Sequence, residues 1–337
     1  MFSNRRLLVY LLITWALLLM RTNPFEGDQH QQTALKVKQL FPELSARIPD
    51  LARIEISDID SEVVLELPSE DSPYSSLHWL VRDKRHPADR AKLMFLINAI
   101  SELRGIDLVS IRKSSHEVYG VSEGDGTRVQ MFDKSGALIV DWIAGAIRSQ
   151  DIVAGDHPVF EYYMRRTDSD EVYLSGGAIQ PSSDSLDWCD VKFLQGIDAD
   201  QIDAITRLDY QTKTRWKISR VNSAAQSADS QHWRVIEPEG FVVSNFAGDS
   251  MAFSCSNLHA SDVIAMASTE GADNAKYGFP LDKFIVEISG QELEFEFGNP
   301  AREGHRYMRV SGLQHIYTIS DFEVGQLRQN LESLSQE

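Results

Sequence analysis

Two stretches of the 337-residue chain share one pattern: 162–175, "YYMRRTDSDEVYLS", and 306–319, "RYMRVSGLQHIYTI". In each, a Tyr-Met-Arg run is followed by a second tyrosine ten residues after the first. The four tyrosines are Tyr163, Tyr173, Tyr307 and Tyr317. Short apolar runs on both sides of a polar or glycine-containing turn are typical of a β-hairpin. We therefore predict two equivalent hairpins, each late in one copy of a duplicated module.

Other landmarks keep the same order in both halves of the sequence. "HWLVRDK" (78–84) matches "HWRVIEP" (232–238), and "YGV" (119–121) matches "YGF" (277–279). Between them, alternating or continuous apolar runs predict antiparallel strands, with one main helix in each copy. The predicted fold class is therefore α+β, with two tandem duplicated modules that each contain an antiparallel sheet and one main helix.

A helix is predicted from Pro87 to Gly105 in the first copy. Proline is tolerated at the first helical position, and glycine is common just after the last turn. One face of this helix is apolar, through Leu93, Leu96, Ile97, Ile100 and Leu103. The second copy has a weaker helical stretch at 248–259, which matches the first helix after a shift of 155 residues. A Ser320-x-x-Glu323 capping box predicts a further helix at the C-terminus.

The chain opens with an uncharged apolar run from Leu7 to Met20, placed between Arg6 and Arg21. This run is shorter than the ~20 residues that usually span a bilayer, but the flanking arginines extend its effective length. A cleaved signal peptide is the alternative, although no small-residue cleavage site ends the run. We predict an uncleaved, single-pass anchor in the cytoplasmic (inner) membrane. Two arginines before the run place the N-terminus in the cytoplasm and the body outside it, in the periplasm of a Gram-negative cell.

The sequence thus divides into four predicted parts. They are a membrane anchor at 1–22, a polar spacer at 23–40, a first α+β repeat at 41–190, and a second repeat with the C-terminal helix at 191–337. Hydrophobic residues form 42% of the chain, which is enough for packed cores. The formal net charge of −17 disfavours contact with phosphate backbones, so we expect no nucleic-acid partner.

Four stretches resemble the bacterial domain of unknown function 4340 family. They are "FPELSARIPDLARIEI" (41–56), Trp79-Leu80-Val81, "HPADRAKLMFLINAISEL" (86–103) and "EVYGV" (117–121). The likeness covers most of residues 41–331. The resemblance implies a membrane-anchored extracytoplasmic protein, and some members resemble accessory partners of ABC-type exporters related to gliding-motility systems. The family has no established catalytic residues, so the resemblance implies none here.

The block "AGDSM" (247–251) resembles the Gly-Asp-Ser block of one class of esterases, in which Ser250 would be the nucleophile. The 155-residue shift places Ser250 on Phe95, which has no hydroxyl. Gly-Asp-Ser is also ordinary chemistry at the start of a helix, and no Asp-x-x-His pair follows. We expect a helix start, with a hydrolase as the less favoured alternative.

The chain has two cysteines, Cys189 and Cys255. The same shift places Cys255 on Ile100, where it shares an apolar helical face with Met251 and Leu258. A buried structural thiol is the expectation for this position. A disulfide with Cys189 and a reactive thiol are the alternatives, since spacing alone decides neither.

No metal or cofactor site is expected. The carboxylates of "ISDIDSE" (56–62) and "GIDADQIDAI" (196–205) lack the central glycine and distal glutamate of an EF-hand loop. Nucleotide-binding motifs are absent as well. No His-x-x-x-His pair occurs among the nine histidines, which are His30, His78, His86, His116, His157, His232, His259, His305 and His315. Of these, we expect His78 and His232 to share a packing role beside the repeated tryptophans. We therefore predict no catalytic, cofactor-binding or metal-binding residue.

Together, these patterns favour a non-enzymatic scaffold or accessory subunit tethered to the membrane. The resemblance names a membrane-protein partner, with subunits of an ABC-type export complex as the leading one. The N-terminal helix would add contact with the lipid bilayer. The alternative is an extracytoplasmic module that binds a polysaccharide or small ligand, and the hydrolase comes third.

Overall fold

The computed structural model describes six segments of the chain. They are residues 38–68, 79–148, 161–176, 181–222, 231–268 and 270–334. The predicted anchor at 1–22 and most of the spacer at 23–40 lie outside these segments. Within them, no helix is both long and apolar enough to cross a membrane. The chain divides into unit 1 (1–49, 98–129 and 139–181) and unit 2 (50–97, 130–138 and 182–337).

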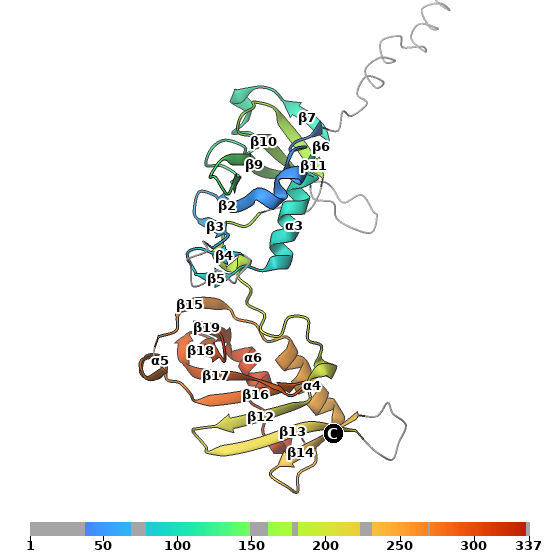
Figure 1. Ribbon diagram of the computed structural model, residues 1–337, viewed down its shortest axis with the longest axis vertical. Helices are drawn as coiled ribbons and strands as arrows, with labels where there is room; N and C mark the ends of the chain where they lie inside the picture. The colour runs from blue at the N-terminus through green and yellow to red at the C-terminus, as the bar shows by residue number, and fades with distance from the viewer. Residues whose placement is uncertain are drawn as a thin grey trace, which may run out of the picture. The chain divides into compact units, whose positions relative to one another are not determined.

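The structure is a mixed α/β protein with mostly antiparallel sheets and few helices, as the sequence predicts (Figure 1). The longer helices are α3 (Arg90–Ser101), α4 (Asn245–Ser256), α5 (Glu270–Tyr277) and α6 (Asp321–Leu327). The short ones are α2 (Leu44–Arg47), α7 (Leu331–Leu334) and the 3-10 turns η1 (Ile48–Asp50), η2 (Lys113–Ser115), η3 (Ser185–Trp188) and η4 (Ala199–Gln201).

Three sheets contain the described strands. A two-stranded sheet pairs β1 (Lys38–Gln39) with β6 (Arg104–Gly105). The nine-stranded sheet contains β2 (Leu51–Ser57), β3 (Glu62–Glu66), β4 (Leu80–Val81), β5 (His86–Pro87), β7 (Asp107–Ser110), β8 (Thr127–Asp133), β9 (Leu138–Arg148), β10 (Glu161–Arg166) and β11 (Val172–Gly176). The eight-stranded sheet contains β12 (Ala204–Asp209), β13 (Thr214–Asn222), β14 (Gln231–Glu237), β15 (Asp262–Met266), β16 (Asp282–Ile288), β17 (Gln291–Arg302), β18 (His305–Val310) and β19 (His315–Ser320).

The two larger sheets have the same internal strand order. From its second strand onward, the nine-stranded sheet runs β4-β3-β2-β8-β9-β10-β11-β7. The eight-stranded sheet runs β14-β13-β12-β16-β17-β18-β19-β15. In both, the first three strands run in reverse chain order, and a strand that comes after the main helix, β7 or β15, lies at the far edge. Strands from matching places in the sequence therefore take matching places within each sheet.

The paired Tyr-Met-Arg stretches form hairpins of the same register. Met164 pairs with Tyr173 across β10 and β11, and Met308 pairs with Tyr317 across β18 and β19. The first tyrosine of each stretch packs against the tyrosine of the preceding Tyr-Gly motif. The ring centroids are 4.7 Å apart for Tyr119 and Tyr163, and 4.8 Å apart for Tyr277 and Tyr307. The repeated letters thus correspond to repeated contacts.

The close approach of two backbones also recurs. A Cβ atom on Gly145 would lie 2.4 Å from the carbonyl oxygen of Tyr119. On Gly298 it would lie 2.3 Å from the carbonyl oxygen of Tyr277. Real Cβ atoms do not approach so closely, and a backbone oxygen cannot turn aside. Each sheet therefore requires glycine where the Tyr-Gly motif crosses a neighbouring strand. That strand is β9 for Gly145 and β17 for Gly298.

Helices α3 and α4 have equal length and matching buried positions. Both have twelve residues and are 155 residues apart. The buried apolar positions of α3 are Leu93, Leu96, Ile97 and Ile100, and the buried positions of α4 are Gly248, Met251, Ala252 and Cys255. The shift inferred from the sequence therefore holds for these four positions. It does not hold for Ser101, which is buried and matches the half-buried Ser256.

The ends of α3 differ from the prediction. Pro87 lies in β5, and the helix begins after Asp89, whose carboxylate accepts hydrogen bonds from the N–H groups of Ala91 and Lys92 at 2.9 and 3.1 Å. An aspartate at this position satisfies N–H groups that have no partner inside the helix. Gly105 does not end the helix, since it lies in β6. A Cβ atom there would lie 2.5 Å from the Tyr173 ring, so packing requires the glycine.

The C-terminal helix is divided. Ser320 accepts a hydrogen bond from the N–H of Phe322 at 3.1 Å and begins α6 as predicted, but the chain leaves the helix after Leu327 and forms α7 separately. Between the two helices, the Arg207 guanidinium donates to the carbonyl oxygens of Arg328 and Gln329 at 3.1 and 3.4 Å. Arg207 and Arg328 also both pair with Asp282, at 3.1 and 2.5 Å. The hydrogen bonds from Arg207 occupy the two carbonyl oxygens that a continuous helix would use.

Candidate functional site

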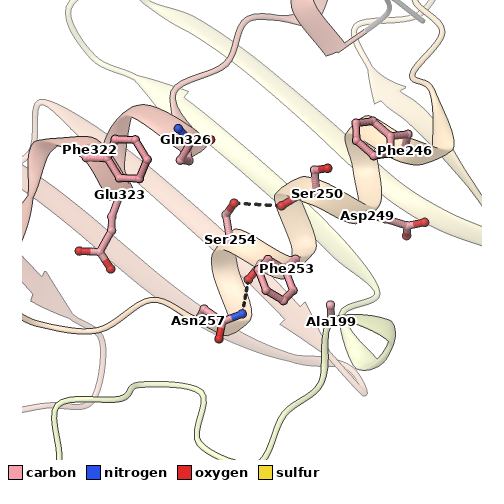
Figure 2. Close-up of a pocket in the computed structure, with 10 residues that line it drawn as sticks. All are labelled: Ala199, Phe246, Asp249, Ser250, Phe253, Ser254, Asn257, Phe322, Glu323 and Gln326. Atoms are coloured by element: carbon pink, nitrogen blue, oxygen red, sulfur yellow. Dashed lines mark hydrogen bonds between the residues drawn. The ribbon is translucent and has the colours of Figure 1, made fainter.

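A groove of about 700 Å³ lies between α4 and α6 in unit 2. Its lining residues are Ala199, Phe246, Asp249, Ser250, Phe253, Ser254, Asn257, Phe322, Glu323 and Gln326 (Figure 2). Eight of them lie on the two helices, Asn257 directly follows α4, and Ala199 belongs to η4. The buried faces of α4 and α6 hold the helices in place, so the groove is formed by the faces that they leave outside.

Three phenylalanines give the groove its character. Phe246 and Phe253 on α4 are 83% and 63% exposed, and Phe322 on α6 is 74% exposed. Phe246 and Phe253 are seven residues apart, which is about two helical turns and places them on one side of α4. Single exposed apolar side chains are common, but several in one concave site mark an interaction surface. This groove is therefore the strongest candidate functional site in the described part of the chain.

The carboxylate on the α4 wall is firmly positioned. Asp249 accepts a hydrogen bond from the indole N–H of Trp233 at 2.9 Å and pairs with Arg220 at 3.0 Å. The Arg220 guanidinium also stacks over the Trp233 ring, 4.6 Å from its centroid, and donates to the carbonyl oxygen of Ala199 at 3.0 Å. This chain of contacts joins η4, β13, β14 and α4 at one end of the groove.

The carboxylate on the α6 wall is less well compensated. Glu323 is mostly buried, and its ion-pair partner is His259, whose Nδ1 lies 2.9 Å away. Burial raises the pKa of Glu323, and the pairing with His259 opposes that shift. Two of the lining residues are carboxylates, Asp249 and Glu323, and none is a lysine or arginine. The groove is thus apolar at its centre and acidic on its walls.

The structure places Ser250 in this groove but gives it no catalytic partner among the described residues. Its carbonyl oxygen accepts a hydrogen bond from the Ser254 hydroxyl at 2.9 Å, which is ordinary helix chemistry (Figure 2). No histidine or carboxylate is hydrogen-bonded to its own hydroxyl in the described segments. Nucleophilic catalysis by serine needs such a base within reach.

The Gly-Asp-Ser block does not start the helix as expected. α4 begins at Asn245, and its N-cap is Ser244, whose hydroxyl accepts from the N–H of Ala247 at 3.1 Å. Gly248 lies a full turn inside the helix for a packing reason. A Cβ atom there would lie 2.2 Å from Cγ of Trp233. The glycine therefore makes room for the tryptophan, and the resemblance to an esterase block has a structural cause.

Both cysteines are free and buried, so the disulfide alternative is wrong. Cys255 lies on the buried face of α4, where the sequence predicted it, and the Cys189 thiol donates to the carbonyl oxygen of Ser185 at 3.4 Å. Burial raises the pKa of each thiol to about 12. A thiol that stays protonated is a poor nucleophile, so both positions are structural.

The carboxylate clusters form turns. Asp58 accepts from the N–H groups of Asp60 and Ser61, both at 2.8 Å, and Asp198 caps η4 together with Gln201. In the six described segments, no group of three or more His, Cys, Asp or Glu residues could hold a metal ion. His30, His78 and His157 lie outside those segments, so the expected packing role of His78 stays a prediction.

A buried histidine pair escaped the sequence reasoning. In unit 2, the rings of His86 and His315 are 4.8 Å apart, and His86 Nε2 lies 3.1 Å from the Tyr317 hydroxyl. Burial lowers the pKa of His86 to about 4, and the nearby His315 acts in the same direction. Burial also lowers the pKa of His315 and raises that of Tyr317. These groups are neutral packing elements near pH 7, and 229 positions separate the two histidines, so no local pattern could join them.

The fold and the groove define a mixed α/β, mainly antiparallel protein with a surface suited to contact and without a described catalytic constellation. The family model described as Domain of unknown function (DUF4340) matches residues 79–232. The resemblance expected from the sequence is thereby confirmed over that range. No curated protein and no solved structure matches the chain.

Proposed function

We propose that this protein is a non-enzymatic scaffold or accessory subunit, tethered to the inner membrane by residues 1–22, with its body in the extracytoplasmic space. The groove between α4 and α6 is the contact site, and a membrane protein is the partner. Subunits of an ABC-type export complex are the leading choice. The observation that carries the proposal is the exposure of Phe246, Phe253 and Phe322 around one groove.

We further propose that the body arose by tandem duplication of one α+β module. The common strand order, the common hairpin register and the 155-residue offset between α3 and α4 support this origin. The exposed aromatic groove distinguishes the second module. In α3, the residues at the places of Phe246 and Phe253 are Ala91 and Asn98. The contact site would then be a property acquired by one module after duplication.

A photo-reactive amino acid at position 253 of the full chain tests the proposed function in native membranes. The control carries the same group at Phe95 on α3, which is 60% exposed and lies at the place of Ser250. We expect position 253, and not position 95, to form an adduct with a membrane protein, identified by mass spectrometry as an exporter subunit. Absence of such an adduct, or recovery of the chain outside the membrane fraction, contradicts the proposal.

The alternative is a ligand-binding module, which the size of the groove favours because small-molecule sites commonly have ~300–1,000 Å³. Replacement of Ser250 distinguishes the third candidate, a hydrolase, from the scaffold. Ser250→Ala leaves a scaffold intact, whereas it abolishes the activity of an esterase. A loss of cellular function in Ser250→Ala, with the fold unchanged, would therefore revive the enzyme.

A further inference from the structure

The groove between α4 and α6 carries information about the chemistry of its occupant. Phe246 and Phe253 are roughly 10 Å apart along α4, at 1.5 Å for each of seven residues. Apolar side chains at positions i and i+7 of a second helix have the same spacing, and helix-in-groove recognition uses such anchors. Phe322 closes the opposite wall. The apolar part of the groove therefore matches two turns of a helix.

Two polar side chains of the groove, Ser254 and Asn257, are already hydrogen-bonded to α4. The Ser254 hydroxyl donates to the carbonyl oxygen of Ser250 at 2.9 Å, and the Asn257 amide donates to that of Phe253 at 2.9 Å. Both donors are thus used by α4 itself (Figure 2). The three aromatic rings are phenylalanines, which have no polar tip for a hydroxyl group. The lining favours an apolar peptide face over a polysaccharide.

The charges favour a cationic partner. Glu323 is largely withdrawn from water, and its carboxylate accepts backbone hydrogen bonds from Ser320 and His259 and pairs with the His259 imidazole. It has no lysine or arginine partner among the described residues, so a basic side chain brought by an occupant would add an ion pair. A second copy of this chain would bring the same acidic helices, because a symmetric dimer joins identical faces. Like charges would then meet across the contact. An anionic lipid surface is disfavoured for the same reason.

We infer that the groove binds an amphipathic helix of a partner protein, with large apolar side chains two turns apart and a lysine or arginine placed against Glu323. This inference rests on the proposed function of the same groove and adds the chemical identity of the partner segment. Phe246, Phe253 and Phe322 supply the apolar contacts. Glu323 supplies orientation, because only one direction of the helix brings its basic end to α6.

The test uses the full chain in detergent and fluorescein-labelled, side-chain-stapled helices of about 16 residues as probes, read by fluorescence anisotropy. The first probe has leucines at i, i+4 and i+7 with flanking lysines. The second has glutamines in place of the lysines, and the third has the composition of the first in scrambled order. We expect the scrambled helix to bind at least about tenfold more weakly than the first, because central anchor residues carry most of the binding free energy.

Variants of the chain assign the contact. Phe253→Ser should raise the Kd of the first probe about tenfold, while Phe95→Ser on α3 leaves it unchanged. Phe246→Ser provides a second groove variant if Phe253→Ser loses its fold. Glu323→Gln should weaken the lysine probe several-fold and leave the glutamine probe unaffected. Equal binding of the ordered and scrambled probes, or an unchanged Kd in both phenylalanine variants, overturns the inference.

Two further outcomes separate this inference from the proposed function. An adduct at position 253 with a membrane protein, together with no probe binding, keeps the scaffold and rejects the basic helix. Probe binding without any adduct keeps the basic helix and rejects the membrane partner. A dimer seen by sedimentation equilibrium and abolished by Phe253→Ser would assign the groove to a second copy, and that result also overturns the inference.

Discussion

Helices α3 and α4 lie 155 residues apart and have matching buried positions, but they differ in bulk at one of these positions, where α3 has Leu93 and α4 has Gly248. In α3 the large buried side chain belongs to the helix itself, at Leu93, and Trp79 in the preceding segment is only half-buried. α4 has Gly248 at the place of Leu93, and the bulk comes from Trp233, which is 4% exposed. The helix that has glycine at this position is thus the one whose matching tryptophan is buried.

The largest expected effect comes from filling the space that Gly248 leaves for Trp233. Gly248→Leu gives α4 the residue of α3, but Trp233 already fills the space, so we expect a loss of about 3 kcal/mol in the free energy of unfolding. Chemical denaturation measures it. Gly271→Ala in α5 is the matched control, since nothing lies within 4 Å of the added methyl group and the change should stay within about 1 kcal/mol.

A double variant sharpens the same comparison. Trp233→Ala alone should cost about 3–5 kcal/mol because it leaves a cavity. Combined with Gly248→Leu, the two losses should fall short of their sum by more than 1 kcal/mol, since each change partly compensates the other. Strict additivity would show that Gly248 and Trp233 are not energetically coupled.

The next effect concerns the two Tyr-Met-Arg hairpins, β10–β11 and β18–β19. Tyr317 in β19 packs against His86 and His315, whereas Tyr173 in β11 bonds to Lys38 and Glu171. The folded-state pKa of His86, about 4, lies below the ordinary 6.5, so the unfolded chain binds the proton first as the pH falls. Stability from His86 is therefore complete above pH 6.5 and is lost between pH 6.5 and 4.

Urea denaturation of the full chain at pH 7.5 and 4.5 measures this loss. The shift of His86 corresponds to roughly 2.5 kcal/mol over that interval. His86→Gln removes the titrating group, so its stability should depend less on pH by that amount. The variant serves as its own control at pH 7.5, and a pH dependence as steep as that of the unaltered chain would contradict the assignment.

The smallest effect separates the two tyrosine hydroxyls. Tyr317→Phe leaves His86 Nε2 without its partner in a buried site, which should cost about 1–2 kcal/mol. Tyr173→Phe releases Lys38 and Glu171, whose side chains are 50% and 37% exposed and turn to water, so less than about 0.5 kcal/mol is expected. Equal losses in the two variants would show that the hairpins are alike in environment as well as in register.

Regular periodicity accounts for what the sequence could predict of the fold. Most strands of the two sheets alternate or run apolar, and the buried face of α3 follows the helical period, so these elements are predictable from the sequence. The edge strands β7 and β15 are not among the predicted strands. α5 was missed because "EGADNAKY" is polar and glycine-containing. The start of α3 was misplaced because Pro87 suits a first turn as well as a strand, and tertiary pairing with β4 decided for the strand.

The groove could be predicted only in part. Ser250 belongs to a Gly-Asp-Ser block whose glycine makes room for Trp233. The sequence pattern around the three phenylalanines does not indicate that they share a groove. Their meaning depends on the packing of α6 against α4, which brings Phe322 beside residues about 70 positions earlier. Periodicity tells which face of α4 points inward, but the neighbour of its outer face follows from the folded chain alone.

The ion pairs of Arg207 have a practical consequence for how the chain is handled. Residues 328–334 are held by Arg207 at one end, and at the other the carbonyl oxygen of Leu334 accepts from the N–H of Ser244, the residue that caps α4. A purification tag or fluorescent fusion joined directly after Leu334 would strain these hydrogen bonds. Through α6, it would also disturb the wall of the groove that bears Phe322. A spacer after Glu337, or a tag elsewhere, leaves these hydrogen bonds intact. The fusion then does not disturb the groove whose binding it is used to measure.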